Sequence, residues 1–356
     1  MRYVAQNCLR PGQKLAFDLK MNDNRIFLRK GVILTRAIID RIKTIGFQGA
    51  YIDDDISQDL VIANVISEEL VAKAKSDIKN WFLEVEAGDK NAAGRTMHTI
   101  RDAIQDMVEQ IQHNSRTMVN IVDLRTFDDY TYSHCLNVGV ISAVIGTVMG
   151  LNKKSLQELA TSSLVHDIGK VFIAKEIINK PATLDEEEYT EMKKHVEKGY
   201  QYLRQYNRLA PAAMSGVLEH HERYSGQGYP KGLRGNDISL FGRIIALSDV
   251  YDALISDRPY RRALLPSNAV EYIMSGYGKD FDPVVVEAFI KKVAPYPVGT
   301  CVSLSNGLSA IVVGNNEGFG LRPLVRVIED GKPTQEFMDL SADKFANLTI
   351  TGILAV

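Results

Sequence analysis

The stretch SSLVHDIGKVFIAKEIINKP, residues 162–181, places an adjacent histidine and aspartate inside an apolar pattern. The pair is His166 and Asp167, and Lys170 follows about one helical turn after His166. A polar or charged side chain that leaves water costs free energy unless a hydrogen bond, an opposite charge or a metal ion satisfies it. We therefore expect this pair to lie at a metal site in a helical domain.

Most of the other histidines lie near this stretch. The chain has seven histidines, and five of them fall between residues 134 and 221. Apart from one adjacent pair, successive members are 25 to 32 residues apart, which is about one helix plus one connection. Helical bundles build metal sites from side chains on facing helices. The predicted ligands are therefore His134, His166, His195, His220 and His221.

The two adjacent pairs, His166–Asp167 and His220–His221, indicate more than one ion. Neighbouring residues on a helix diverge by about 100°, so a pair suits two ions ~3.5–4 Å apart better than one ion. Asp167 is the candidate for a carboxylate that bridges both ions. Asp249, which follows an apolar run, is the predicted seventh ligand, and Asp252 is its rival. Imidazole and carboxylate ligands suit two divalent ions, with Fe or Mn favoured.

Composition excludes several other classes of protein. Of 356 residues, 45% are hydrophobic and 24% are charged, and the net charge is -2, so a nucleic acid polymer is not an expected partner. The three cysteines have no CxxC spacing, which argues against a disulfide framework or a thiolate zinc site. The apolar run at 135–152 is shorter than the ~20 residues of a membrane span. With no pattern typical of a signal peptide, we expect a cytoplasmic protein without membrane insertion.

Four segments are predicted along the chain, and the fold class is mainly α. Residues 1–57 are interpreted as a small α/β interaction module, with chain breaks at Gly31 and Gly46, and residues 58–120 as a helical connector. Residues 121–296 carry the ligands on helices. Residues 297–356 have short β-prone runs between glycines and are expected to form a small β-rich region.

Five motifs occur within residues 123–296, in the order DDYTYSHCLNV, LVHDIGK, INKPATLDEEEYTEMKKHVEKG, EHHERYSGQGYPKGL and ALSDVYDALISDRPYRRA. In order and spacing they resemble the HD-GYP family, a branch of the HD-domain metal-dependent phosphohydrolases. The resemblance implies an HD-type helical bundle that hydrolyses cyclic di-GMP to pGpG, and in some members to GMP. It also implies a cluster of two or three metals. Two-metal chemistry then predicts attack on the phosphate by a metal-bridging hydroxide.

The resemblance also assigns roles to single residues. It matches metal ligands to His134, His166, Asp167, His195, His220, His221 and Asp249. It matches substrate contacts to Lys170, Tyr229, Arg258 and Arg261, and it gives Asp167 and Lys170 catalytic roles. Lys170 is expected to reach a phosphate oxygen, and the arginines are expected to form bidentate hydrogen bonds with phosphates or bases.

The chain departs from the family pattern at two positions. Family members with a third metal have a glutamate where this chain has Tyr130, so we expect two metals, with Asp128 and Asp129 nearby and Asp129 as an outer contact at most. The family commonly has aspartate where Ser225 stands, which bears on loop geometry and substrate preference.

Other hypotheses remain open at this point. A catalytically weak module could bind cyclic di-GMP and signal through partners, or the substrate could be another cyclic dinucleotide. Oxygenation at a histidine-rich di-iron site is disfavoured by the cationic Lys170, Arg258 and Arg261. Glu222 is either a carboxylate that orients a ligand imidazole or a surface residue. Protein partners of the N-terminal module and a homodimer also stay open.

Overall fold

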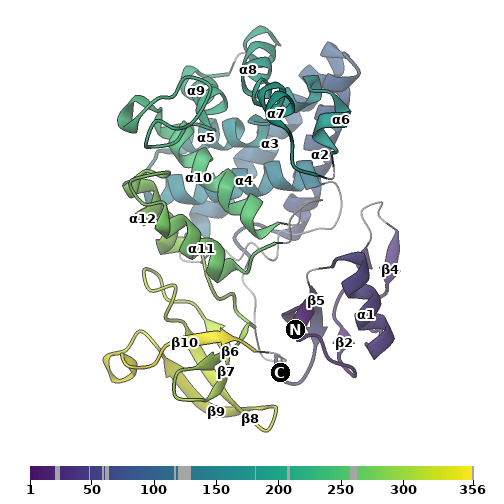
Figure 1. Ribbon diagram of the computed structural model, residues 1–356, viewed down its shortest axis with the longest axis vertical. Coiled ribbons are helices and arrows are strands. Elements are labelled where there is room, and N and C mark those ends of the chain that lie inside the picture. The colour runs from purple at the N-terminus through teal and green to yellow at the C-terminus, as the bar shows by residue number, and fades with distance from the viewer. Residues whose placement is uncertain are drawn as a thin grey trace. The chain divides into compact units, whose positions relative to one another are not determined.

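The computed structural model describes residues 1–20, 25–47, 49–57, 60, 64–115, 118, 130–180, 182–206, 209–256 and 263–354. Contacts divide the chain into two units. The helical unit comprises Val65–Val119 and Tyr130–Lys292. The mixed unit comprises Met1–Asn64, Asn120–Asp129 and Val293–Val356, and therefore takes in both ends of the chain (Figure 1).

The helical unit is a bundle, as the prediction of a mainly α fold requires. Its longer helices are α2 (Glu68–Glu86), α3 (Lys90–His113), α4 (Tyr130–Val148), α5 (Lys153–Val165), α8 (His195–Tyr206), α9 (Pro211–Glu219), α10 (Leu240–Ile255), α11 (Pro266–Ser275) and α12 (Pro283–Lys292). The shorter ones are η3 (Ile168–Phe172), α6 (Lys175–Ile178), α7 (Glu186–Lys193) and η4 (Gly235–Asp237).

Local sequence explains where several of these helices begin. Ser67 and Asn152 accept hydrogen bonds from the backbone N–H three residues later, which caps α2 and α5. At α7, Asp185 and Glu188 form a capping box, in which each side chain accepts from the backbone N–H of the other residue. These caps satisfy N–H groups that have no partner within the helix.

Helix α4 is the central helix of the bundle. It packs against α2, α3, α5, α10 and α12, so almost every face of it must be apolar. By length and composition the stretch Thr131–Val148 could cross a membrane, but 78% of it is buried inside the structure, as expected of a core helix. Its first turns carry His134, which brings a polar side chain into the core.

The first part of the mixed unit is a small α/β fold. Its elements are β1 (Arg2–Ala5), η1 (Gln6–Cys8), β2 (Lys14–Leu15), β3 (Leu19–Lys20), β4 (Ile26–Leu28), α1 (Arg36–Ile45) and β5 (Gly49–Asp53). The strands form an antiparallel sheet in the order β1-β5-β2 and a separate β3-β4 pair. Ile39 and Ile42 of α1 are buried, and Gly46 ends the helix with a φ of 97°, a conformation that favours glycine.

The last part of the mixed unit is a five-stranded antiparallel sheet. Its elements are β6 (Cys301–Leu304), β7 (Ser309–Gly314), β8 (Leu324–Glu329), β9 (Lys332–Asp339), η5 (Asp343–Phe345) and β10 (Ile350–Ile353), with strand order β10-β6-β7-β8-β9. Val312, Val325 and Val327 of β7 and β8 are buried in one apolar cluster. Ile311 and Ile328 of the same strands are buried in a second cluster with Ile56, so both faces of the sheet carry buried apolar side chains. This agrees with the predicted β-rich C-terminal region.

Buried contacts join these two parts. Arg2 is 2% exposed; its Nε lies 2.9 Å from Asp54 Oδ2, and its Nη1 donates to Cys301 Sγ at 3.0 Å. Arg326 Nη2 donates to the carbonyl of Ile56 at 3.1 Å. The four-part division of the chain stays a prediction, but these contacts place its first and last segments in one unit.

Candidate metal centre

The seven predicted ligands converge at one place in the helical unit. His134 and Asp249 come from α4 and α10. The others lie at helix ends: His166 and His220 are the residues that end α5 and α9, Asp167 and His221 follow them directly, and His195 begins α8. Helix ends suit this purpose because the chain can turn there and aim successive side chains in different directions. All seven are buried except His221, which is 18% exposed.

Asp167 is shared by two groups of ligand atoms. One group joins His134, His166 and Asp167, the other joins Asp167, His195, His220 and His221, and within each group the ligand atoms lie within 4.8 Å of one another. The two carboxylate oxygens face different groups. Oδ2 is 3.4 Å from His166 Nε2 and 3.8 Å from His134 Nε2, whereas Oδ1 is 3.4 Å from His195 Nε2 and 4.0 Å from His220 Nε2. This is the geometry expected of a bridging carboxylate.

Asp249 lies between the same two groups. Its Oδ1 is 3.2 Å from Nε2 of His134, and its Oδ2 is 3.8 Å from Nδ1 of His221. The carboxylate can therefore reach an ion in either group.

Three of the imidazoles are oriented by the helix that precedes them. In each, Nδ1 lies against the backbone carbonyl three residues earlier, near a helix end where carbonyls lack helical partners. Donation from Nδ1–H leaves Nε2 as the lone-pair nitrogen that faces the centre. The pairs are His166 with Ser163, His195 with Met192 and His220 with Val217, each at 2.7 Å.

The inward-facing atoms have unsatisfied bonding capacity. Nε2 of His166, His195 and His220 and Oδ1 of Asp167 are buried and have no hydrogen-bond partner among the described residues. Buried polar atoms are rarely left in this state unless a water or an ion satisfies them. Nitrogen and carboxylate donors at these distances fit metal ions, so the residues present suit the cofactor that the sequence predicts.

Burial keeps most of these imidazoles in the form that binds metal. It lowers the pKa of His195 to about 4 and holds the pKa values of His220 and His221 well below their usual range. At neutral pH these rings are therefore neutral, as a metal ligand must be. For Asp167, burial acts to raise the pKa, but Lys170 and His166 outweigh it and lower the pKa well below its usual value.

His134 behaves differently in the metal-free protein. Burial acts to lower its pKa, but hydrogen bonds to Asp249 and Asp252 outweigh burial and raise the pKa to about 9. The ring then carries a proton on the nitrogen that faces Asp249. An ion bound in this group would replace that proton, because metal ligation requires the neutral ring.

Two of the four predicted substrate contacts lie at the centre. Lys170, which is 30% exposed, pairs with Oδ2 of Asp167. The ring of Tyr229 stacks on His221 with centroids 4.7 Å apart, and its backbone N–H donates to the carbonyl of His221 at 3.2 Å. Arg258 and Arg261 lie outside the described residues, as do Asp128, Asp129 and the side chain of Tyr130.

The structure gives Asp252 and Asp249 different positions relative to the centre. Asp252 accepts a hydrogen bond from the outer nitrogen of His134, Nδ1, at 2.7 Å, and another from Asn137 Nδ2 at 2.8 Å. It therefore lies behind the ligand ring and does not compete with Asp249 for the centre.

Glu222 has neither of the roles considered from the sequence. It is 1% exposed, so it is not a surface residue. Its carboxylate accepts from the backbone N–H groups of Lys231 at 2.8 Å and Leu233 at 3.0 Å and orients no ligand imidazole through these bonds. Glu222 thus holds the loop that carries Tyr229.

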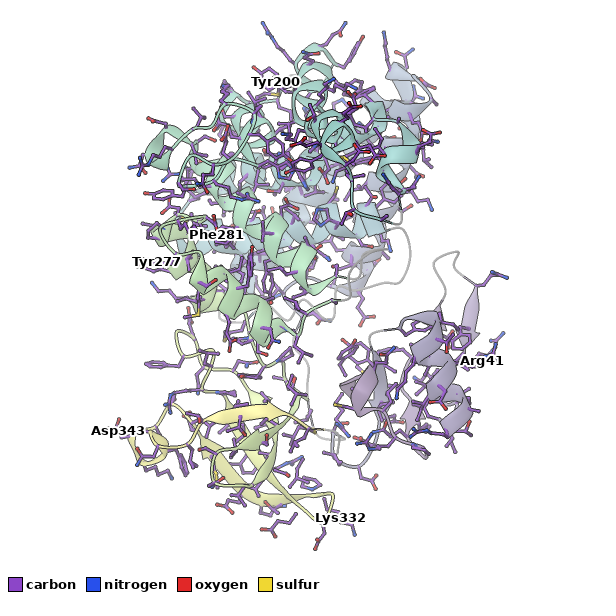
Figure 2. All side chains as sticks on the ribbon, in the orientation of Figure 1. Arg41, Tyr200, Tyr277, Phe281, Lys332 and Asp343 are labelled. Atoms are coloured by element: carbon purple, nitrogen blue, oxygen red, sulfur yellow. The ribbon has the colours of Figure 1, made fainter. Side chains whose placement is uncertain are left out.

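A neighbouring loop supports the same region. Backbone N–H groups of Tyr224 and Ser225 donate to the carbonyls of Asp280 at 3.2 Å and Lys279 at 2.7 Å. These acceptors belong to the turn between Tyr277 and Phe281, both labelled in Figure 2. The hydroxyl of Ser225, where the family commonly has aspartate, is buried, and no residue in the described part of the chain forms a hydrogen bond with it.

Gly169 is a functional position that sequence reasoning missed. A Cβ at this residue would collide with the carbonyl of His195 and the backbone nitrogen of Gly199. Only glycine therefore lets η3 lie against α8 closely enough to bring His195 to Asp167. The available signal was its place two residues after Asp167, as the single glycine in the stretch 162–181.

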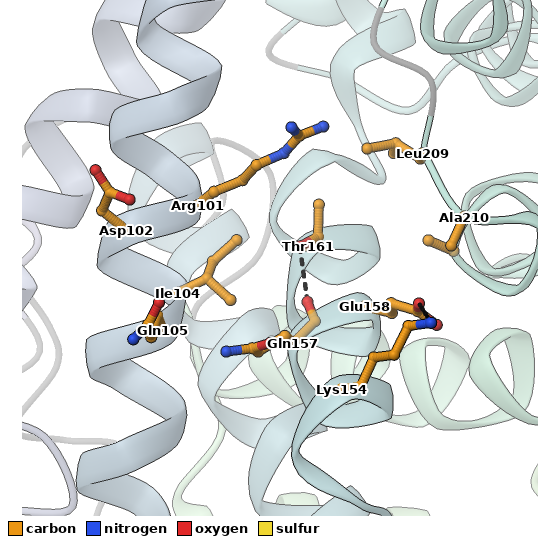
Figure 3. A pocket seen from close by; sticks show the side chains of 11 residues that line it. Arg101, Asp102, Ile104, Gln105, Lys154, Gln157, Glu158, Thr161, Leu209 and Ala210 are labelled. Atoms are coloured by element: carbon orange, nitrogen blue, oxygen red, sulfur yellow. Dashed lines mark hydrogen bonds and ion pairs between the residues drawn. The ribbon is translucent and has the colours of Figure 1, made fainter.

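A separate pocket of about 360 Å³ lies between α3, α5 and the start of α9 (Figure 3). Its lining mixes charged, polar and apolar side chains, namely Arg101, Asp102, Ile104, Gln105, Lys154, Gln157, Glu158, Thr161, Leu209, Ala210 and Ala213. Among the residues that the structure describes, none of the predicted ligands lines it, and neither does Lys170 or Tyr229. The chemistry of the buried cluster, and not pocket volume, identifies the candidate site.

Comparison with known proteins agrees with this site. A family model described as an HD domain matches residues 98–285. A cyclic di-GMP phosphodiesterase of Pseudomonas aeruginosa is 32% identical over 258 residues, which cover 72% of this chain and 61% of the relative. A 3′3′-cGAMP-specific phosphodiesterase of Vibrio cholerae is 34% identical over 187 residues, 52% of this chain and 35% of the relative. The chain thus spans less than two thirds of the length of either relative.

One solved structure supports the fold alone. It is that of an HDG"Y"P protein from Bdellovibrio bacteriovorus, with a TM-score of 0.51 at 19% identity. The match covers 81% of this chain and 97% of that protein.

Proposed function

The chain belongs to the HD-domain family, and from this we propose that it is a metal-dependent phosphodiesterase that hydrolyses cyclic di-GMP to linear pGpG. One observation carries the proposal: the two oxygens of Asp167 face two separate groups of imidazoles. The motif resemblance to HD-GYP proteins and the Pseudomonas aeruginosa relative support this substrate class.

The proposed cofactor is a pair of divalent ions, with Fe or Mn favoured by the donor set. His134, His166 and Asp167 would hold one ion, Asp167 with His195, His220 and His221 would hold the other, and Asp249 can reach both groups. Such a pair, when bound, supplies Lewis-acid stabilisation of a phosphate and activation of water. Two divalent cations outweigh the charge of two carboxylates, so the site attracts a phosphodiester anion.

The chain's own residues supply the remaining functions. Lys170 lies at the edge of the cluster and is partly exposed, so its ammonium group can bind a non-bridging phosphate oxygen and offset the charge that develops on it. Tyr229, stacked on His221, offers a ring and a hydroxyl to the base or ribose of the substrate. Buried Glu222 holds the Tyr229 loop in place. The roles of Arg258 and Arg261 rest on the motif resemblance.

A second candidate substrate is another cyclic dinucleotide. It is favoured by the Vibrio cholerae relative named for 3′3′-cGAMP and by Ser225, where the family commonly has aspartate. A module that binds without cleaving is less well supported, because all seven predicted ligands converge at one place. Cytoplasmic location, protein partners of residues 1–57 and a homodimer stay predictions from the sequence.

The test is product analysis. The full chain is purified without oxygen, loaded with Mn(II) or Fe(II), and incubated separately with cyclic di-GMP and 3′3′-cGAMP before chromatography. We expect pGpG from cyclic di-GMP, and a loss of at least ~10²-fold in rate for Asp167→Ala. Asp54→Ala, in the mixed unit, is the matched control and keeps the wild-type rate. Unchanged cyclic di-GMP in the presence of about two bound ions per chain would refute the proposal.

A further inference from the structure

Asp252 lies behind the metal centre, on the outer side of one ligand ring. Its Oδ2 is 2.7 Å from Nδ1 of His134, and its side chain is 0% exposed. In His166, His195 and His220 the same nitrogen meets a backbone carbonyl. Among these four ligands, His134 is therefore the one whose Nδ1 meets a carboxylate side chain and not a backbone carbonyl.

Two neighbouring helices present this arrangement on matching faces. Asn137 follows His134 by three residues on α4, and Asp252 follows Asp249 by three residues on α10. Residues at this spacing share a helix face. Asn137, which is 3% exposed, donates to Oδ1 of Asp252 at 2.8 Å. Each helix thus supplies one ligand and, one turn later, one residue that supports the His134 ring.

A carboxylate and a carbonyl differ in what they do to a ligand ring. Both accept the proton of Nδ1 and so select the tautomer with a lone pair on Nε2. The carboxylate also brings a full negative charge, which makes Nε2 a stronger donor to a cation. Partners of this kind typically change metal affinity by about 10–100-fold.

We propose that Asp252 is a positioning residue that aims Nε2 of His134 at the centre and tightens metal binding in the group of His134, His166 and Asp167. In the second group, Nδ1 of His195 and Nδ1 of His220 meet backbone carbonyls at 2.7 Å. The carboxylate nearest to Nδ1 of His221, that of Asp249, is farther away, at 3.8 Å. The two metal positions are therefore unequal. This inference rests on the metal centre of the proposed function and does not depend on the substrate.

Asp252→Asn is the variant that isolates the charge. It keeps the shape of the side chain, and its amide oxygen can still accept from Nδ1 of His134. Asn137 can reverse its own amide to accept from the new amide group, because its Oδ1 is buried and has no hydrogen-bond partner within the described ranges.

Ser142→Ala is the matched control. Ser142 Oγ donates to Ser248 Oγ at 3.0 Å, and both side chains are 0% exposed. The control therefore removes another buried hydrogen bond between α4 and α10 without touching a ligand ring.

The measurement is titration of the metal-free full chain with Mn(II), followed by calorimetry and by the paramagnetic resonance signal of free Mn(II). For Asp252→Asn we expect one of two ions to bind about 10–100-fold more weakly and the other to keep its affinity. Both ions keep their affinity in Ser142→Ala. Nitrogen-15 spectra of the histidines in the Zn(II)-loaded protein, a diamagnetic stand-in, should show a changed Nδ1 environment for His134 in Asp252→Asn alone.

Three results would overturn the inference. They are wild-type affinity for both ions in Asp252→Asn, equal weakening of both ions together with a lowered unfolding midpoint, and a wild-type chain that binds no Mn(II). A wild-type chain that binds two ions but leaves cyclic dinucleotides intact contradicts the proposed function instead, and the effect of Asp252 can still be measured on it.

Discussion

Both units bury ionisable side chains, but they satisfy them in different ways. In the mixed unit, Arg2 is 2% exposed and is neutralised within the protein by Asp54, with a further hydrogen bond to Cys301. In the helical unit, the inner nitrogens of His166, His195 and His220 are buried, and the described residues offer them no hydrogen-bond partner. In both units, removing these polar groups from water costs free energy unless a partner satisfies them. The difference teaches that a buried charge paired within the protein holds a fold together, whereas a buried ligand atom without a partner marks a place for something that binds.

Removal of metal should produce the largest difference in stability between the two units. An ion present at 1,000 times its dissociation constant stabilises the folded state by about 4 kcal/mol, so the two ions of the proposed centre would contribute about 8 kcal/mol. Chelation should therefore reduce protection from hydrogen exchange in α4, α5, α9 and α10 and leave β6, β7 and β8 unchanged. Exchange measured by mass spectrometry checks this. Equal loss of protection in both units would contradict the comparison.

Acid should produce the next largest difference in stability between the two units, measured on the metal-free protein. All seven histidines belong to the helical unit. Burial lowers the pKa of His195 to about 4, against about 6.5 in an unfolded chain. Between these values the unfolded state binds more protons, so stability is lost as pH falls from 6.5 towards 4. His220 and His221 act in the same direction, each by about 1.4 kcal/mol per pH unit.

The contribution of His134 to stability changes with pH in the opposite direction. Its folded pKa is about 9, so its contribution is present below pH 6.5 and is lost as pH rises through 9. The single tryptophan, Trp81, lies in α2 and reports unfolding of the helical unit alone. Its fluorescence in denaturant at pH 7.0, 6.0 and 5.0 should show a falling midpoint. A midpoint that is constant over this range would rule out buried neutral histidines.

The smallest effect should come from the paired charge of the mixed unit. Asp54→Ala leaves the buried Arg2 guanidinium without its carboxylate, which typically costs 3–5 kcal/mol. Because Asp54 is 19% exposed, we expect about 3 kcal/mol, the lower end of that range. Hydrogen exchange should increase in β1 and β6, while Mn(II) affinity stays at the wild-type value.

Asp53→Ala is the matched control for this variant. Asp53 pairs with Lys14 at 3.0 Å, but both side chains are about half exposed, and such a pair contributes little. We expect wild-type exchange in β1 and β6. If Asp53→Ala and Asp54→Ala behave alike, burial of the Arg2 pair has no structural importance.

Much of the candidate site was predictable from residue type and order. Few side chains bind metals, so five histidines at helix-length intervals and two adjacent pairs already indicate a shared centre. The helical bundle and both β-containing ends followed from periodicity and glycine breaks, as Gly46 illustrates with its φ of 97° at the end of α1. These features depend on local sequence, so they can be predicted without knowledge of the tertiary packing.

The roles of the acidic residues were decided by the tertiary structure. Asp249 and Asp252 are three residues apart on α10, yet one faces two ligand groups and the other supports His134 from behind. Glu222 follows His221 directly in sequence, but its carboxylate holds a loop nine to eleven residues further on. Arg2 and Cys301, 299 residues apart, meet in the mixed unit. Sequence by itself determined which groups can bind a metal, because that is a property of each side chain; which atom faces which depends on how helices and loops pack, and only the folded chain decides that.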